Sequence, residues 1–166
     1  MDSALTYAGT VEPNGENEGP AVVRKSLASV GLDPGYPYCA AFLSYMLEKT
    51  GADRPDVRSA LATDFLEAER TVDAADVRRG ARTLESGAVV VWRKGNGPYG
   101  HAGFAWKDDL DPSIGWEHRC AYTVEANTTP PDGEGSQREG QGIWTRHRCI
   151  VTTSYFRIEG FVPTAP

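Results

Sequence analysis

The spacing of apolar residues changes about half-way along the chain. In the first half they recur every three or four positions, which is the spacing of one face of a helix. Clear examples are Val22, Val23, Leu27 and Val30, followed by Ala41, Phe42, Tyr45 and Met46. From Gly87 onward, short apolar runs indicate β-strands instead. Helices followed by strands predict an α+β fold, with the first helices packed on one side of an antiparallel sheet.

Residues that start and stop helices set the predicted bounds. The first helix should begin within residues 17–20, where Asn17 or Gly19 can act as the N-cap and Pro20 suits the first turn, and it should end at Gly31. We predict further helices over residues 38–50, 59–70 and 75–79, and a loop over residues 10–20.

The second half of the chain predicts five strands separated by turns. They cover residues 87–92, 101–106, 121–127, 143–149 and 155–161. A glycine-rich hairpin over residues 95–100 joins the first two, and a polar loop occupies residues 130–142. Neither an internal repeat nor a long linker is evident, so we expect a single domain over residues 1–166.

Composition and charge narrow the range of partners. The chain has 166 residues, with 17 Lys and Arg against 23 Asp and Glu, and a formal net charge of −6. An acidic protein has no general attraction for nucleic acid or anionic membranes, so we expect neither partner. Residues 146–148 form the most basic local patch, which we interpret as an exposed strand face. No apolar run is long enough for membrane insertion, and the N-terminus does not resemble a secretory signal.

Cys39 is the first candidate for chemistry. It follows Pro37 by two positions, and the predicted helix over residues 38–50 begins around it. In the first helical turn, the helix dipole and the unpaired backbone N–H groups favour the thiolate, which is the nucleophilic form. The alternative is a buried cysteine that only packs. Cys120 and Cys149 lie in predicted strands without zinc-site spacing. A disulfide between them is geometrically conceivable, but two separate buried thiols are the preferred interpretation.

A cysteine nucleophile needs a base, and His101 is the best-placed histidine. It begins a strand directly after the glycine-rich hairpin, which places it near the edge of the sheet, where a helix N-terminus can meet it. His118 lies in a polar segment and His147 lies between two arginines, so both are weaker candidates. A surface or structural role is the alternative for any single histidine.

Glu125 and Asn127 are two positions apart on one predicted strand, so they point to the same face, either toward water or into a shared cleft. A carboxylate that accepts a hydrogen bond from an imidazole fixes its tautomer and stabilises its charged form. We therefore expect Glu125 to orient His101. Asn127 can serve the same purpose or donate to a substrate carbonyl.

Three segments together resemble the CHAP family, the cysteine- and histidine-dependent amidohydrolases and peptidases. They are residues 37–42 (Pro-Tyr-Cys-Ala-Ala-Phe), 100–104 (Gly-His-Ala-Gly-Phe) and 124–128 (Val-Glu-Ala-Asn-Thr). Their order along the chain is that of the family, and residues 142–146 (Gly-Ile-Trp-Thr-Arg) resemble the stretch that follows the Glu-x-Asn strand in these proteins.

The resemblance implies a papain-like α+β fold and hydrolysis of an amide bond in bacterial peptidoglycan. Carried over singly, it implies that Cys39 is the nucleophile, His101 the general base and then acid, and Glu125 the group that orients His101, while Asn127 assists at the site. The enzyme would be an N-acetylmuramoyl-L-alanine amidase or a peptidoglycan endopeptidase. Tyr36 and Tyr38 flank the expected cleft and are candidates for substrate contact, although each can equally be a packing residue.

No cofactor or metal is expected. Some relatives hold calcium in an acidic loop before the cysteine, but here residues 32–36 contain one carboxylate, Asp33, which offers too few oxygen ligands. No wall-binding domain is expected within this length. We predict a monomer that is made in the cytoplasm and reaches the wall by release, injection or virion delivery, as a phage lysin or an antibacterial effector does. A delivery or virion protein is the corresponding partner.

Two other functions stay open at this point. The same fold can bind wall peptides or a partner protein without catalysis, or catalyse another papain-like acyl transfer such as deamidation. Trp92, Trp106 and Trp144 lie on predicted strands, where a place in the core or the cleft wall is the main interpretation and sugar stacking the alternative.

Overall fold

A computed structural model describes residues 1–84, 86–106, 120–131, 140–150 and 156–164 of the chain. Its elements, in chain order, are α1 (Asp2–Leu5), β1 (Thr10–Val11), α2 (Ala21–Ser29), α3 (Cys39–Lys49), the 3₁₀-helix η1 (Ala62–Glu67), β2 (Val72–Asp73), α4 (Ala74–Arg78), β3 (Val89–Lys94), β4 (Gly100–Trp106), β5 (Cys120–Thr128), β6 (Gly142–Cys149) and β7 (Phe156–Val162). This is the α+β arrangement predicted from the apolar pattern.

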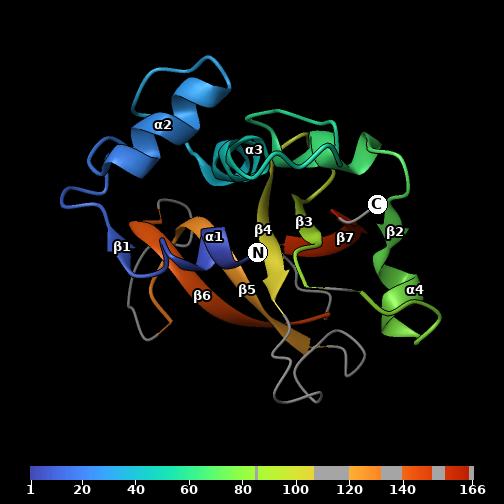
Figure 1. The fold of residues 1–166 in the computed structure, drawn as a ribbon. Helices are drawn as coiled ribbons and strands as arrows, with labels where there is room; N and C mark the ends of the chain where they lie inside the picture. Colours follow the sequence, from blue (N-terminus) through green and yellow to red (C-terminus); the bar gives the residue numbers. More distant parts are fainter. Residues whose placement is uncertain (85, 107–119, 132–139, 151–155, 165–166) are drawn as a thin grey trace.

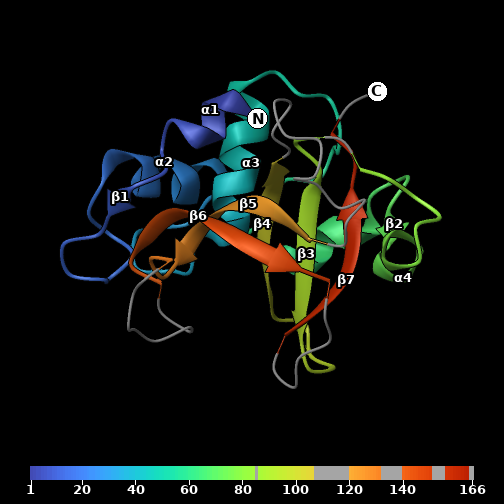
Figure 2. The ribbon, with the colours of Figure 1, turned by 90° about the horizontal axis from the view of Figure 1, so that it is seen from below.

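The strands form one antiparallel sheet in the order β1-β6-β5-β4-β3-β7-β2. The helices α2 and α3 lie over one side of this sheet, and α4 lies beside its β2–β7 end (Figure 1). Figure 2 shows the central strands from the side opposite to these helices. Among the described residues, no helix is long and apolar enough to span a bilayer.

Two apolar clusters flank the sheet. The larger one joins α2, α3 and η1 to the sheet side chains that include Val89, Phe104 and Val124. The smaller one lies on the opposite face and includes Val90, Trp92 and Ala121. The alternation of side chains along each strand separates the two sets, since successive residues point to opposite faces.

Four elements differ from the predicted ones. Residues 59–70 contain only the short 3₁₀-helix η1, residues 2–5 form the unpredicted helix α1, and residues 10–11 and 72–73 add two short edge strands. The hydroxyl of Ser59 donates to Asp64 and accepts from the backbone N–H of Leu61. Such local bonds from side chains compete with α-helical hydrogen bonding, and they account for the shorter helix. The first residue of the last predicted strand, Tyr155, lies outside the described residues.

Candidate active site

Cys39 is the first residue of α3, with Tyr38 at the N-cap position. Its side chain lies at the helix end that carries the unpaired backbone N–H groups. The residue is buried with 7% of its surface exposed, and it is the chain's free cysteine. The predicted location at a helix start is therefore observed, and the chemical role of the thiol follows from what surrounds it.

His101 lies next to Cys39 and connects it to Glu125. Its Nε2 atom lies 3.0 Å from Oε2 of Glu125, and the ring also forms a hydrogen bond with the Cys39 thiol. Because Nε2 faces Glu125, Nδ1 is the nitrogen left for the sulfur. His101 is near the start of β4, the central strand of the sheet, so it lies at a strand end and not on an edge strand.

Glu125 is fully buried and lies on β5, directly opposite Gly103 of β4. A Cβ atom at residue 103 would be 2.8 Å from Cγ of Glu125, so a glycine is required for this side chain to fit. Among the described residues, the carboxylate has four hydrogen-bonding contacts. Oε1 accepts from Thr123 (2.5 Å) and from Nε of Arg148 (2.8 Å), while Oε2 contacts His101 and accepts from Nη2 of Arg148 (2.6 Å).

These contacts govern the charges of the three groups. Burial raises the pKa of the Cys39 thiol, but the hydrogen bond and charge of His101, with the backbone N–H groups of Ala102 and Ala40, outweigh burial and leave this pKa lowered. Burial lowers the pKa of His101, but its hydrogen bonds with Cys39 and Glu125 prevail and raise it to about 9. The combination favours a thiolate–imidazolium pair near neutral pH.

The carboxylate of Glu125 stays ionised for a similar reason. Burial raises its pKa, but the hydrogen bonds from Arg148 and then from His101 outweigh burial, so the pKa lies well below its usual range. The site thus combines a thiol, an imidazole and a charged carboxylate in contact with one another. Such a chain is suited to nucleophilic attack followed by proton donation.

Asn127 lies at an irregularity near the end of β5, where the pairing with β6 shifts between Ala126 and Thr128. Its backbone has a positive φ of 55°, so it does not follow the simple alternation that the sequence suggested. The side chain is buried, and its Oδ1 atom finds no hydrogen-bond donor among the described residues. Its backbone N–H donates to the hydroxyl of Tyr38.

The two tyrosines expected at the cleft have different environments. Tyr38 is fully buried, and its hydroxyl donates to Oε1 of Glu12 at 2.6 Å. Burial and this bond to Glu12 raise its pKa. In this conformation Tyr38 supports the start of α3 and offers no surface to a substrate. Tyr36 is 54% exposed three residues before Cys39, and Tyr99, which the sequence did not single out, is 68% exposed two residues before His101.

Arg148 donates hydrogen bonds to Glu125, and the sequence did not reveal this contact. The patch over residues 146–148 was expected to be an exposed strand face, and this expectation is wrong for the arginines. Only His147 is exposed, while Arg146 and Arg148 point to the face that carries Glu125. The alternation of side chains along a strand already implies that His147 points away from the face of Arg146 and Arg148. The partner of Arg148, in contrast, depends on the pairing of β5 with β6.

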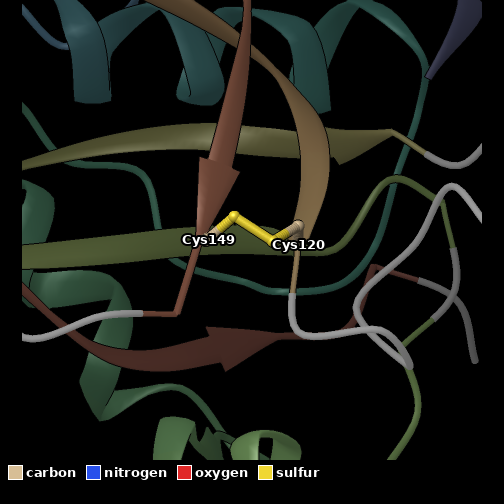
Figure 3. The surroundings of a disulfide bond; sticks show 2 residues. All are labelled: Cys120 and Cys149. Atoms are coloured by element: carbon tan, nitrogen blue, oxygen red, sulfur yellow. A yellow bond between two sulfur atoms is a disulfide. The ribbon is translucent and has the colours of Figure 1, made fainter.

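The expectation of two separate thiols is also wrong. Cys120 and Cys149 lie directly opposite each other in the β5–β6 ladder, and they form a disulfide (Figure 3). His147 lies close enough for the three potential ligand atoms to fall within 4.8 Å of one another, but the disulfide ties up both sulfurs. The expectation that no calcium is held before Cys39 rests on Asp33 as the one carboxylate of residues 32–36, and it stays a prediction. His118, the competing base, lies outside the described residues.

The comparison with known families agrees with this geometry. The family model of the CHAP domain matches residues 31–127, which is more than half of the chain and includes Cys39, His101, Glu125 and Asn127. The chain belongs to the CHAP family. Membership places the chain among peptidoglycan-related amidases and peptidases that depend on cysteine and histidine. No curated protein and no solved structure matches the chain. The matched segment of the CHAP domain runs from the loop before α3 to β5, and β6 with Arg148 lies beyond it.

Proposed function

We propose that this CHAP domain hydrolyses an amide bond of bacterial peptidoglycan by a thiol mechanism. Cys39 is the nucleophile, His101 the general base and then acid, and Glu125 the residue that orients His101. The observation that carries the proposal is the continuous contact from the Cys39 thiol through the His101 ring to the ionised Glu125. Packing alone does not require a buried thiolate, imidazolium and carboxylate in one row.

The reaction follows from the charges of these groups. The Cys39 thiolate attacks the scissile carbonyl carbon, and the C–N bond breaks as the His101 imidazolium gives its proton to the leaving amine. Water then attacks the thioester, His101 takes the proton of this water, and the carboxylic acid leaves as the thiolate reforms. The backbone N–H of Cys39 at the start of α3 is a donor suited to the oxyanion.

Substrate contacts are proposed on the exposed side of the site. Tyr36 and Tyr99 are largely exposed, and each precedes one of the two reacting residues in the chain. An exposed tyrosine can pack its ring against a peptide or a sugar and still offer its hydroxyl. Asn127 remains a candidate for assistance at the site through its buried amide, whose oxygen accepts no bond from described residues.

The test compares wild-type protein with Cys39→Ala on purified sacculi, with mass spectrometry of the digest. We expect the variant to lose turnover by about 10³-fold or more, because the attacking group is gone. New amino termini on the stem alanine would identify an amidase, and cuts within the stem or cross-bridge an endopeptidase. Because Cys39 is the free thiol, iodoacetamide should label it alone in the unreduced protein. A variant as active as the wild type would refute the thiol mechanism.

A further inference from the structure

We infer that Arg148 is a positioning residue of the proposed hydrolase, which keeps Glu125 aligned with His101 throughout the reaction. The inference rests on the proposed function and adds a residue outside the cysteine, histidine and glutamate row. It begins from the two hydrogen bonds that Arg148 donates to Glu125, 2.8 Å from Nε to Oε1 and 2.6 Å from Nη2 to Oε2.

The geometry of this contact restricts rotation of the carboxylate. Two parallel N–H donors of a planar guanidinium hold both oxygens at once, which fixes the plane of the carboxylate as well as its position. The oxygen that contacts His101, Oε2, is one of the two atoms held in this way. If the carboxylate rotated, Oε2 would move out of line with Nε2 of His101.

Arg148 also supplies a permanent positive charge beside Glu125, which His101 does not. Glu125 is fully buried, and a buried carboxylate without a cation nearby is costly. In the proposed mechanism His101 loses its proton to the leaving amine, so its own positive charge disappears during each turnover. Arg148 keeps its charge at every step, because a guanidinium does not give up its proton at ordinary pH.

The surroundings hold Arg148 in place. Its guanidinium lies 5.8 Å from the ring centroid of Trp92, and that ring lies 5.4 Å from the ring of His101. The next residue, Cys149, is cross-linked to Cys120 on β5, so the backbone beside Arg148 is tied to the strand that carries Glu125 (Figure 3). Arg146 points to the same face but donates to the carbonyls of Thr129 and Pro130 instead.

The experiment is a double-mutant cycle on sacculi with Arg148→Met and Glu125→Gln. Because Arg148 acts through Glu125, Arg148→Met alone should lower kcat about 10- to 100-fold with little change in KM. In the Glu125→Gln background, Arg148→Met should cause no further decrease in kcat. The kcat of Arg148→Lys should lie between those of the wild type and Arg148→Met, because an ammonium group retains the positive charge but not the two-point contact with the carboxylate.

Arg93→Met provides a matched control. The Arg93 side chain is 29% exposed and pairs with Glu159, whereas that of Arg148 is 26% exposed and pairs with Glu125. We expect the kcat of Arg93→Met to stay within about twofold of wild type, since the Arg93 side chain donates to Glu159 and to the carbonyl of Gly97. Full activity of Arg148→Met, or a further loss of kcat when it is added to Glu125→Gln, would overturn the inference.

The pH profile gives a second readout that a merely structural role would not move. The charged groups around Glu125 are His101 from β4, with Cys39 beyond it on α3, and Arg148 and Arg146 from β6. Removing Arg148 takes away the strongest hydrogen bonds that favour the ionised form. The acid limb of activity should therefore move to higher pH in Arg148→Met but stay in place in Arg148→Lys.

The outcomes also separate this inference from the proposed function. If Cys39→Ala abolishes turnover while Arg148→Met leaves kcat and the acid limb unchanged, the role of Arg148 is refuted and the hydrolase stands. If Cys39→Ala retains turnover, both fail. Should Arg148→Met not fold, Arg148→Lys takes its place as the single variant of the cycle with Glu125→Gln. A kcat of Arg148→Lys equal to that of the wild type would then overturn the inference.

Discussion

Glu125 and Glu159 lie on strands of the same sheet, and within the described part of the chain each carboxylate contacts two basic side chains. Glu125 pairs with Arg148 and His101, whereas Glu159 pairs with two arginines. The side chains also differ in exposure, which is 0% for Glu125 and 18% for Glu159. An arginine keeps its charge at ordinary pH, but an imidazole can lose its charge. Only the environment of Glu125 can therefore change during a reaction.

The comparison shows that a paired carboxylate is not by itself a sign of function. Burial raises the pKa of Glu159, and its bonds from Arg157 and Arg93 then lower it, so the direction of the net shift is the same as at Glu125. What distinguishes Glu125 is that one of its partners is titratable and contacts a thiol. The pair at Glu159 fits a structural role, as a fixed contact between β3 and β7.

The largest expected difference is between Glu125→Gln and Glu159→Gln. We expect Glu125→Gln to lower kcat about 10²- to 10⁴-fold, because the imidazolium loses its charged partner and its orientation. Glu159→Gln should change kcat less than about twofold and cost about 1 kcal/mol in the free energy of unfolding. Steady-state kinetics on sacculi and urea denaturation measure the two effects. Equal losses of kcat in the two variants would abolish the distinction.

A smaller difference is expected between the glycines that lie beside these carboxylates. In Gly103→Ala the new Cβ would be 2.8 Å from Cγ of Glu125 and 2.9 Å from the carbonyl oxygen of Val124. The strand must shift, so we expect a loss of about 1–3 kcal/mol in stability. Because Glu125 is displaced from His101, kcat should fall as well, about 10-fold or more.

Gly160→Ala is the matched substitution next to Glu159. Its Cβ would meet the side-chain ends of Leu66 at 2.9 Å and Thr71 at 3.1 Å, together with the carbonyl oxygen of Val72 at 3.3 Å. Stability should fall here too, since Gly160 pairs within the sheet, but kcat of the folded protein should not change. Thermal denaturation and kcat measured on the same samples separate the two effects. A normal kcat in Gly103→Ala would show that the close fit to Glu125 is not needed for turnover.

The sequence predicted those features that depend on neighbours along the chain. Pro37 and the helix formers after it located the helix start at Cys39, and glycines bounded the strand that begins near His101. The row from Cys39 through His101 to Glu125 was expected from the residue types and their predicted elements, and the family resemblance supported it, because residue spacing alone does not bring α3 to β4. The catalytic roles of these residues remain predictions.

Features that depend on long-range pairing were not predicted. The β5–β6 register places Cys120 opposite Cys149 and brings Arg148 to the face of Glu125, and no local pattern encodes that register. Tyr38 was expected at the cleft because it adjoins Cys39, but Glu12, 26 residues earlier in the chain, binds its hydroxyl in the interior. The sequence around Glu12 resembles a loop, and nothing in it indicates that the Glu12 carboxylate is buried beside Tyr38.

The smallest expected effect is a shift in the alkaline limb of activity. The hydrogen bonds that raise the pKa of His101 to about 9 keep it protonated at neutral pH, and its usual value is about 6.5. Activity should therefore fall as pH rises through about 9, because the leaving amine loses its proton donor. In Glu125→Gln the residual activity should fall at lower pH, by about one pH unit, while the limb of Glu159→Gln should stay where it is in the wild type.

The raised pKa of His101 also affects the stability of the fold and the reactivity of the Cys39 thiol. These two properties allow the origin of the alkaline limb of activity to be tested. A raised pKa in the folded state means that the contribution of His101 to stability is complete below about pH 6.5 and is lost as pH rises through about 9. Iodoacetamide labelling of Cys39 should nevertheless stay fast above pH 9, since the thiolate persists when the imidazole is neutral. If circular dichroism showed unfolding over the same pH range as the loss of turnover, loss of the folded site would explain the alkaline limb, and the titratable partner would no longer distinguish Glu125 from Glu159.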